Sequence, residues 1–371
     1  MQRRGNVRRW LLIGGSIAVL GFALSAFAWS NRTSIAAWYA IRGLTNSAPA
    51  ERGDWIARLQ AMDPPPVRQL VSGLRSSDSR ICENLTQGLT LLVRSWTSDN
   101  SNCVNLAIEL AAQFPMLSAT GQAAALEVYG LLVHAGSDLS ASHELTQATA
   151  EILSAAAGVE NTAVHTRALA LLERIDETVG PSPDLLASGR RLVIACLSDK
   201  QTSCRMHALQ LARRPEMNLV NEVVGLLNDP EPELRRSAML IVGPIESSIT
   251  TDNLLHWLHD PDGEVRGLCE KALRARGLQD SHLLLGRTMT DSRPGTRLQV
   301  IELLKRADDL EPGVWLRRLS HDPSAAVRAA AIRAAAEQSL AQLADRLEQM
   351  SQNDPCATVR QLAQFYLSTY H

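Results

Sequence analysis

The side chains in this sequence that are most able to react or to bind metals are those of six cysteines and nine histidines. Thiols pair as disulfides in oxidising compartments, and thiolates and imidazoles bind metals. Cys196 ends one expected helix and Cys204 begins the next across a short turn, so their side chains can approach easily. These two residues are the candidate disulfide. No two cysteines have the C-x-x-C spacing that is typical of redox or zinc sites.

Two histidines, His256 and His259, are three residues apart, a spacing that can bring two imidazoles together. No third ligand follows at a standard spacing. His259 directly precedes an aspartate, as does His321, which favours a role at a helix C-terminus, where a histidine suits the helix dipole. The sequence therefore predicts neither a metal site nor a cofactor.

Motifs of the common enzyme classes are missing from the sequence. It contains no G-x-S-x-G elbow for a nucleophilic serine and no G-x-x-x-x-G-K-S/T loop for a nucleotide. The formal net charge is −2, with 37 basic and 39 acidic residues. This balance argues against nucleic acid as a partner, because nucleic-acid binders concentrate positive charge. We expect a non-catalytic protein.

The C-terminal half contains an internal repeat of about 31 residues. Successive aspartates are 30, 31, 31, 31 and 32 residues apart, and each is followed six residues later by an arginine. The pairs are Asp199/Arg205, Asp229/Arg235, Asp260/Arg266, Asp291/Arg297, Asp322/Arg328 and Asp354/Arg360. Upstream, Asn161 and Arg167 keep the same offset.

Each copy of the repeat has the features of a helix start. The aspartate can cap the first turn, and the proline that often follows it needs no hydrogen-bond partner for its nitrogen. A mostly apolar residue stands five positions after the aspartate and a mostly small one nine after, which traces one buried stripe. A second apolar segment precedes each aspartate. Each copy is thus predicted to form two antiparallel helices that stack on neighbouring copies.

The signature Asp-Pro-x-x-x-Val-Arg-x-x-Ala, complete at Asp322–Ala331 and Asp354–Ala363, resembles HEAT repeats, in particular the short HEAT-like repeats also found in phycobilisome lyases. The resemblance implies an α-solenoid that binds protein partners. It also implies that the repeated aspartates and arginines form a structural ladder between neighbouring repeats. A lyase-like enzyme that uses the groove of the solenoid is an alternative that the resemblance leaves open.

The first residues resemble a membrane anchor. Four arginines lie within residues 1–9, and residues 10–31 carry no charge. Trp10 to Trp29 spans about 30 Å as a helix, the thickness of a bilayer core, with tryptophans at both ends. Because Ala26-Phe27-Ala28 also fits a cleavage site, a signal peptide is the alternative. Both alternatives export the rest of the chain.

The arginine cluster predicts a cytoplasmic N-terminus, so the bulk of the chain lies outside the cytoplasm, in the periplasm if the source is bacterial. Small residues on one face of the membrane helix would allow close helix packing. These are Gly14, Ala18, Gly21 and Ser25. The structural subunit of a membrane complex, docked through this face, is therefore a further alternative.

Taken together, the patterns predict an all-α protein: a transmembrane helix followed by an α-solenoid that acts as a scaffold or adaptor for another protein. The expected parts are a cytoplasmic tail (1–9), the anchor (10–31), a juxtamembrane segment (32–50), irregular diverged repeats (51–194) and regular HEAT-like repeats (195–371).

Overall fold

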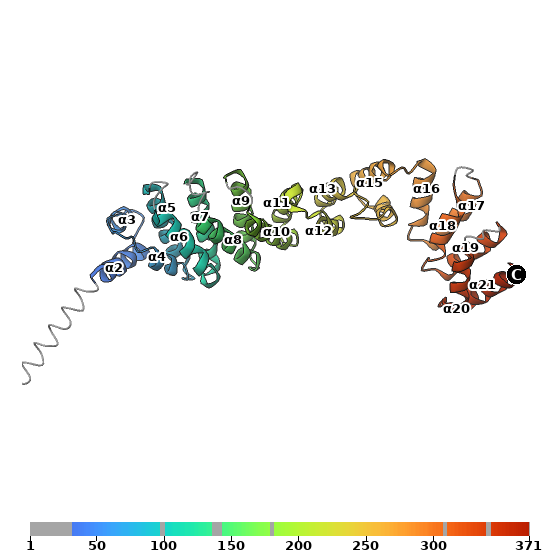
Figure 1. Ribbon diagram of the computed structural model, residues 1–371, viewed down its shortest axis with the longest axis horizontal. Helices are drawn as coiled ribbons and strands as arrows, with labels where there is room; N and C mark the ends of the chain where they lie inside the picture. The colour runs from blue at the N-terminus through green and yellow to red at the C-terminus, as the bar shows by residue number, and fades with distance from the viewer. Residues whose placement is uncertain are drawn as a thin grey trace, which may run out of the picture. The chain divides into compact units, whose positions relative to one another are not determined.

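The computed structural model describes residues 32–96, 101–135, 143–178, 182–306, 310–338 and 343–370 (Figure 1). Every regular element in these ranges is a helix, which confirms the all-α prediction for the described part of the chain. The helices fall into two compact units, one ending at Asn218 and the other beginning at Leu219.

The predicted membrane segment, residues 10–31, lies outside the described residues. The same holds for its small-residue face, formed by Gly14, Ala18, Gly21 and Ser25. Among the helices that the structure does describe, none combines the length and the apolar character that a bilayer crossing requires.

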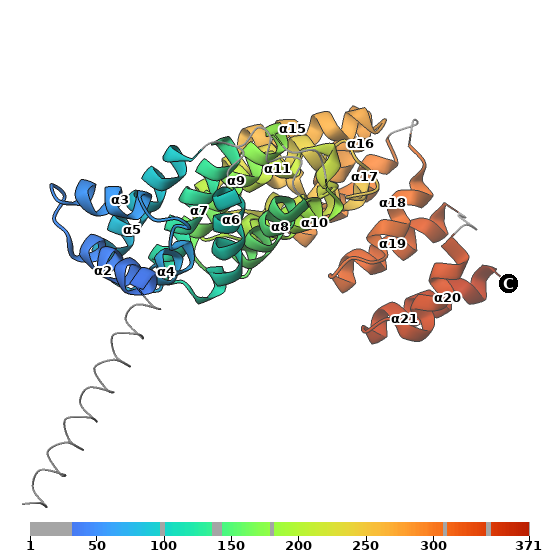
Figure 2. The same ribbon diagram turned by 60° about the vertical axis from the view of Figure 1, so that its left-hand side comes forward.

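The first unit alternates its helices between two layers. One layer contains α5, α7, α9 and α11 side by side, and the other contains α4, α6, α8 and α10 (Figures 1 and 2). The bounds are α2 (Arg32–Asn46), α3 (Arg52–Gln60), α4 (Val67–Gly73), α5 (Ser79–Ser95), α6 (Ser101–Gln113), η1 (Phe114–Met116), α7 (Ala119–Ala135), α8 (His143–Ala157), α9 (Thr162–Thr178), α10 (Pro183–Leu197), α11 (Thr202–Ala212) and η3 (Pro215–Met217).

Apolar side chains at helical spacing form the core between these layers. On α5, Leu85, Leu89 and Leu92 recur every three to four residues and are fully buried. Because each helix packs on the next but one in sequence, every pair of helices is covered by its neighbours, as expected for a solenoid.

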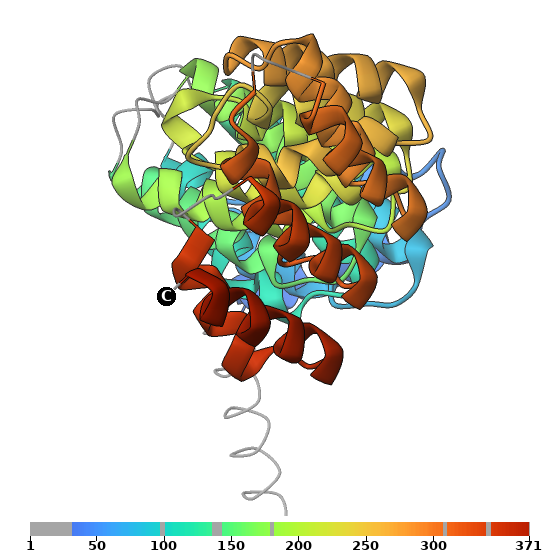
Figure 3. The same ribbon diagram turned by 90° about the vertical axis from the view of Figure 1, so that its right-hand side faces the viewer.

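The second unit contains the regular repeats, which Figure 3 shows from their C-terminal end. The helix before each aspartate is short in the first repeats and continues into a 3₁₀ turn. The bounds are α12 (Val220–Val223), η4 (Val224–Asn228), α13 (Pro232–Val242), α14 (Thr251–Leu254), η5 (Leu255–His259), α15 (Gly263–Ala275), α16 (Asp280–Met289), α17 (Pro294–Leu304), α18 (Pro312–Leu319), α19 (Ala325–Glu337), α20 (Ala344–Asn353) and α21 (Ala357–Tyr370).

The helices that follow the aspartates stack on one another with one interruption. α13 packs on α15, α17 on α19, and α19 on α21, but α15 and α17 do not form such a packed pair in the described structure. α15 ends at Ala275, and two residues later Gly277 has a φ of 93°, which favours glycine. α16 then packs against η5. We call the α15–α17 junction the seam.

The repeat pattern and the compact units have different boundaries. The predicted division between residues 194 and 195 falls inside α10, and the first copy of the repeat, Asp199 to Arg205, belongs to the first unit. That unit ends at Asn218, which has a left-handed φ of 48°, a conformation that asparagine tolerates better than most residues. The sequence motif therefore shows where each repeat begins, whereas the contacts between helices decide where one compact unit ends and the next begins.

Candidate functional site

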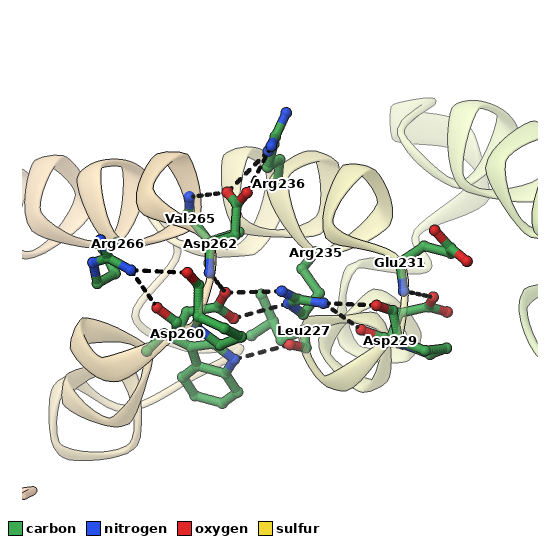
Figure 4. Close-up of polar contacts among 12 residues, drawn as sticks. Leu227, Asp229, Glu231, Arg235, Arg236, Asp260, Asp262, Val265 and Arg266 are labelled. Atoms are coloured by element: carbon green, nitrogen blue, oxygen red, sulfur yellow. Dashed lines mark hydrogen bonds and ion pairs between the residues drawn. The ribbon is translucent and has the colours of Figure 1, made fainter.

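The ladder of the second unit consists of arginines that connect their own repeat to the next. Nη1 of Arg235 donates to the main-chain oxygens of Asp229 (2.9 Å) and Pro230 (3.0 Å). Its Nε and Nη2 donate to the carboxylate oxygens of Asp260 at 2.8 and 2.9 Å (Figure 4). Both side chains are buried. A buried bidentate pair of this kind fixes the register of two adjacent repeats.

The same rung forms at two further places. Arg297 donates to Asp322 at 2.6 and 2.8 Å, and Arg328 donates to Asp354 at 2.8 Å through both nitrogens. The hydrogen bonds and charge of Arg328 hold the pKa of Asp354 below its usual value, even though burial opposes this shift. In these three closed rungs an arginine of one repeat binds the aspartate of the next, whereas a ladder that runs through all six pairs stays a prediction.

All six arginines of the motif share the contact within their own repeat, from Nη1 to the main-chain oxygen of the aspartate six residues earlier. The distances are 2.9 Å for Arg205, 2.9 Å for Arg235, 2.7 Å for Arg266, 2.9 Å for Arg297, 2.9 Å for Arg328 and 2.6 Å for Arg360. The constant offset of six residues therefore reflects a local turn that brings the guanidinium back over the aspartate backbone.

The aspartates do not cap their helices, contrary to the expectation from sequence. Helix α15 begins at Gly263, and its cap is Asp262, which accepts hydrogen bonds from the N–H groups of Glu264 and Val265. Asp260 lies before the helix and accepts the N–H of Asp262 at 2.8 Å. This bond orders the turn and fixes the carboxylate where the preceding arginine reaches it.

One rung is open, at the seam. Arg266 keeps the contact with its own repeat, but the described structure shows no hydrogen bond or ion pair between it and Asp291. Instead, the Asp291 carboxylate accepts from Arg293, two residues later, at 3.1 and 3.0 Å. Those bonds also lower the pKa of Asp291. A local competitor has taken the acceptor that would have connected α15 to α17.

An open hollow of about 700 Å³ lies beside the Arg235–Asp260 rung. Its wall includes Ile249, His256 and Trp257. The Trp257 indole N–H donates to the Leu227 carbonyl at 2.9 Å, and His259 forms a 2.9 Å hydrogen bond with the Arg287 carbonyl. His259 thus contributes to contacts between repeats, and the hollow offers an aromatic and polar surface with an ordered frame.

A second cluster, in the first unit, contains both residues of the candidate disulfide. A ring nitrogen of His165 on α9 and the sulfurs of Cys196 on α10 and Cys204 on α11 all lie within 4.8 Å of one another, and all three residues are buried. The sulfurs are free thiols in the structure. The disulfide between Cys196 and Cys204 therefore stays a prediction, although the two residues are neighbours.

The two thiols of this cluster differ in acidity. The hydrogen bond between them raises the pKa of Cys196, with burial adding to the effect, and it lowers the pKa of Cys204. Cys204 is thus the more readily ionised thiol of the pair.

Asp199 holds the histidine of the cluster in place. His165 Nδ1 lies 2.6 Å from Asp199 Oδ2, while the other carboxylate oxygen accepts from Thr162 and from the N–H of Gln201, each at 2.8 Å. Burial alone would raise the pKa of Asp199, but these hydrogen bonds outweigh it and lower the pKa. The second ring nitrogen, Nε2, is buried and has no hydrogen-bond partner.

Sequence reasoning did not find His165. The offset from Asn161 pointed to Arg167, which donates instead to the Ala163 carbonyl within its own helix at 3.4 Å. The missed signal was a histidine four residues after Asn161, one repeat before the two cysteines that flank Asp199. Only the fold shows that this position faces the aspartate.

Comparison with known proteins leaves the family of this chain open. No family model and no curated protein matches the sequence. Among solved structures, the chain is similar to one from work on tubulin recruitment and assembly by microtubule polymerases with tumor overexpressed gene (TOG) domain arrays. The identity is 12%, the TM-score is 0.23, and the match covers 92% of this chain and 98% of the other.

Proposed function

We propose that this protein is a membrane-anchored, exported scaffold whose stacked helical repeats bind another protein without catalysis. The observation that carries the proposal is the ladder. Buried pairs such as Arg235–Asp260 lock successive repeats together, so the outward faces of the helices remain for a partner. This arrangement matches the short HEAT-like repeats that the sequence resembles.

The hollow beside Asp260 is the candidate contact surface for that partner. It combines an aromatic ring, Trp257, with the polar side chains of Asn253 and His256 on a frame fixed by hydrogen bonds between repeats. Aromatic residues in ordered concave surfaces often contribute strongly to protein binding. A loop or helix end of the partner would fit a hollow of about 700 Å³.

Helix α2, which follows the predicted anchor, supports the membrane part of the proposal. Ile35, Trp38 and Tyr39 are exposed at 48, 59 and 58%, and their spacing places them on one face of the helix. Exposed aromatic side chains of this kind favour the boundary between lipid and water. The guanidinium of Arg42 lies 5.2 Å from the Trp38 ring centre and can face the lipid headgroups.

The binding proposal is tested by placing a photoreactive amino acid at His256 in the full-length chain, in its native membranes. The control carries the same amino acid at Gln361, an exposed position on α21 away from the hollow. We expect a single protein adduct from position 256 and none from position 361. Equal labelling at both positions, or none at 256, would contradict the hollow as the binding surface.

The mass of the mature chain tests the anchor. A chain that retains its first residues and fractionates with membranes supports the anchor, whereas a mature chain that begins after Ala28 would establish the signal peptide. Replacing Gly21 with leucine separates scaffold from complex subunit. Partner binding should persist in the variant, and loss of the chain from a membrane complex would favour the subunit alternative.

A further inference from the structure

The rung at Asp199 differs chemically from the rungs of the second unit. At the closed rungs, an arginine such as Arg328 directs three nitrogens at four oxygen acceptors. At Asp199 the donor is His165, which uses only Nδ1. The imidazole is 9% exposed, and its Nε2 has no partner. A buried polar atom without a partner is rare enough in folded proteins to need an explanation.

The two cysteines occupy positions where other repeats carry ordinary core residues. Cys204 stands five residues after its aspartate, where the later repeats mostly carry branched apolar residues. These are Leu234, Val265, Val327 and Val359. Cys196 stands three residues before the aspartate, where two other repeats carry Leu226 and Leu319. Packing alone therefore does not require sulfur here, yet both sulfurs lie within 4.8 Å of one ring nitrogen of His165 and of each other.

We propose that His165, Cys196 and Cys204 bind one Zn²⁺ ion, with Asp199 as the residue that positions the histidine. Imidazole and thiolate are the ligands that zinc prefers. A histidine that donates its other ring N–H to a carboxylate is the usual arrangement around protein-bound zinc. Here Nδ1 is engaged by Asp199, which leaves the lone pair of Nε2 for the metal.

The spacing of the three ligand atoms is close to that of a zinc site. Zinc bonds of about 2.0–2.3 Å in a tetrahedral arrangement place ligand atoms about 3.3–3.8 Å apart. The present limit of 4.8 Å closes to that range with side-chain shifts of about 1 Å. The three ligands come from α9, α10 and α11, so the ion would join three helices at the end of the first unit.

Zinc accounts for this cluster more completely than a disulfide does. A bond between the two sulfurs would leave His165 Nε2 buried without a partner. A zinc ion engages both sulfurs and that nitrogen together. Such a site would also add stability to the first unit in proportion to the zinc bound, a property beyond the scaffold function.

The test uses the purified full-length chain in detergent, reduced and freed of metal with a chelator. Zn²⁺ is added in excess, unbound ion is removed by desalting, and the retained metal is measured by mass spectrometry. We expect one zinc per chain. With Co²⁺ as a probe, we expect sulfur-to-metal charge-transfer absorption, which reports thiolate ligands directly.

The decisive variant is Cys204→Val, because valine stands at the same position in three later repeats and should preserve the fold. We expect it to retain less than about a tenth of the wild-type zinc and to lose the cobalt absorption. The matched control is Cys269→Ala, which removes a buried thiol outside the cluster, where four other repeats carry alanine (Ala208, Ala238, Ala331 and Ala363). It should bind zinc like the wild type. Asp199→Asn should weaken binding about 10–100-fold.

Three results would overturn the zinc site. The first is wild-type protein that retains no zinc after desalting. The second is a Cys204→Val chain that folds, as judged by circular dichroism, and still retains a full equivalent. The third is non-reducing mass spectrometry of the protein from its host that finds Cys196 bonded to Cys204, which would establish the disulfide instead.

Discussion

Two pairs, Arg328–Asp354 in the second unit and His165–Asp199 in the first, both have the aspartate of the repeat motif as acceptor, but their donors bind it differently. The arginine donates to both carboxylate oxygens and to two main-chain oxygens, so that together these hydrogen bonds connect neighbouring repeats. The histidine reaches one oxygen and keeps a second nitrogen without a partner. A ring nitrogen of this histidine also lies within 4.8 Å of two cysteine sulfurs. An arginine donor thus uses its nitrogens to hold the stack together, whereas the histidine donor, which stands at a different position of its repeat, leaves one ring nitrogen without a partner.

The largest effect should come from breaking a closed rung. Arg328→Ala leaves the buried carboxylate of Asp354 without its partner, and we expect a loss of about 3–5 kcal/mol in the free energy of unfolding. Urea denaturation followed by circular dichroism measures this. Arg333→Ala, an exposed position on the same helix, is the control and should change stability by less than about 0.5 kcal/mol. Equal losses in both variants would show that the rung has no special role.

Next in size is the energetic coupling across a rung. The side chain of Asp260 pairs with Arg235 and not with Arg266, so a double-mutant cycle of Arg235→Ala and Asp260→Ala should give a coupling of about 1–3 kcal/mol. The same cycle at Arg266 and Asp291 should give a coupling near zero because that rung is open. A large value at the seam would mean that the rung closes in solution.

A smaller effect is expected on the pH dependence of stability. Arg328 lowers the pKa of Asp354 from its usual 3.8, so this group stabilises the fold above that pH, and the stabilisation is lost as pH falls through the lowered folded pKa. The difference in Tm between wild type and Asp354→Asn should therefore be widest above pH 5 and narrow below pH 3.8. Asp345→Asn removes an exposed carboxylate paired with Arg317, and its Tm difference should vary less with pH.

The smallest effect on stability is expected for Arg293, which binds Asp291 at the seam. The side chain of Arg293 is 77% exposed and pairs with Asp291. Surface pairs of this kind contribute about 0–1 kcal/mol, so Arg293→Ala should leave stability almost unchanged. The informative measurement is the coupling between Arg266 and Asp291 in this background. A rise from near zero would identify Arg293 as the cause of the open rung, and no rise would assign the cause to the backbone.

Much of this architecture could be predicted from sequence, because repeats impose a period on residues that must pack. The constant offset between each aspartate and arginine revealed the stacked helices. Which rungs close could not be predicted, because the aspartate-to-arginine offset is the same at Asp291 as in the other repeats and does not show that Arg293 binds this carboxylate. The pairing of His165 with Asp199 was hidden for a related reason: its donor stands four residues after Asn161, whereas arginine donors stand six after their aspartates.

The seam between α15 and α17 has a mechanical consequence for the second unit. A repeat array deforms most easily where neighbouring repeats touch least. At the seam the Arg266–Asp291 pair is open, while α16 still packs against η5, supported by the hydrogen bond between His259 and the Arg287 carbonyl. We therefore expect bending of the second unit to concentrate at the seam, with the η5–α16 contact as the hinge. The repeats on either side of the seam would then move as two rigid segments.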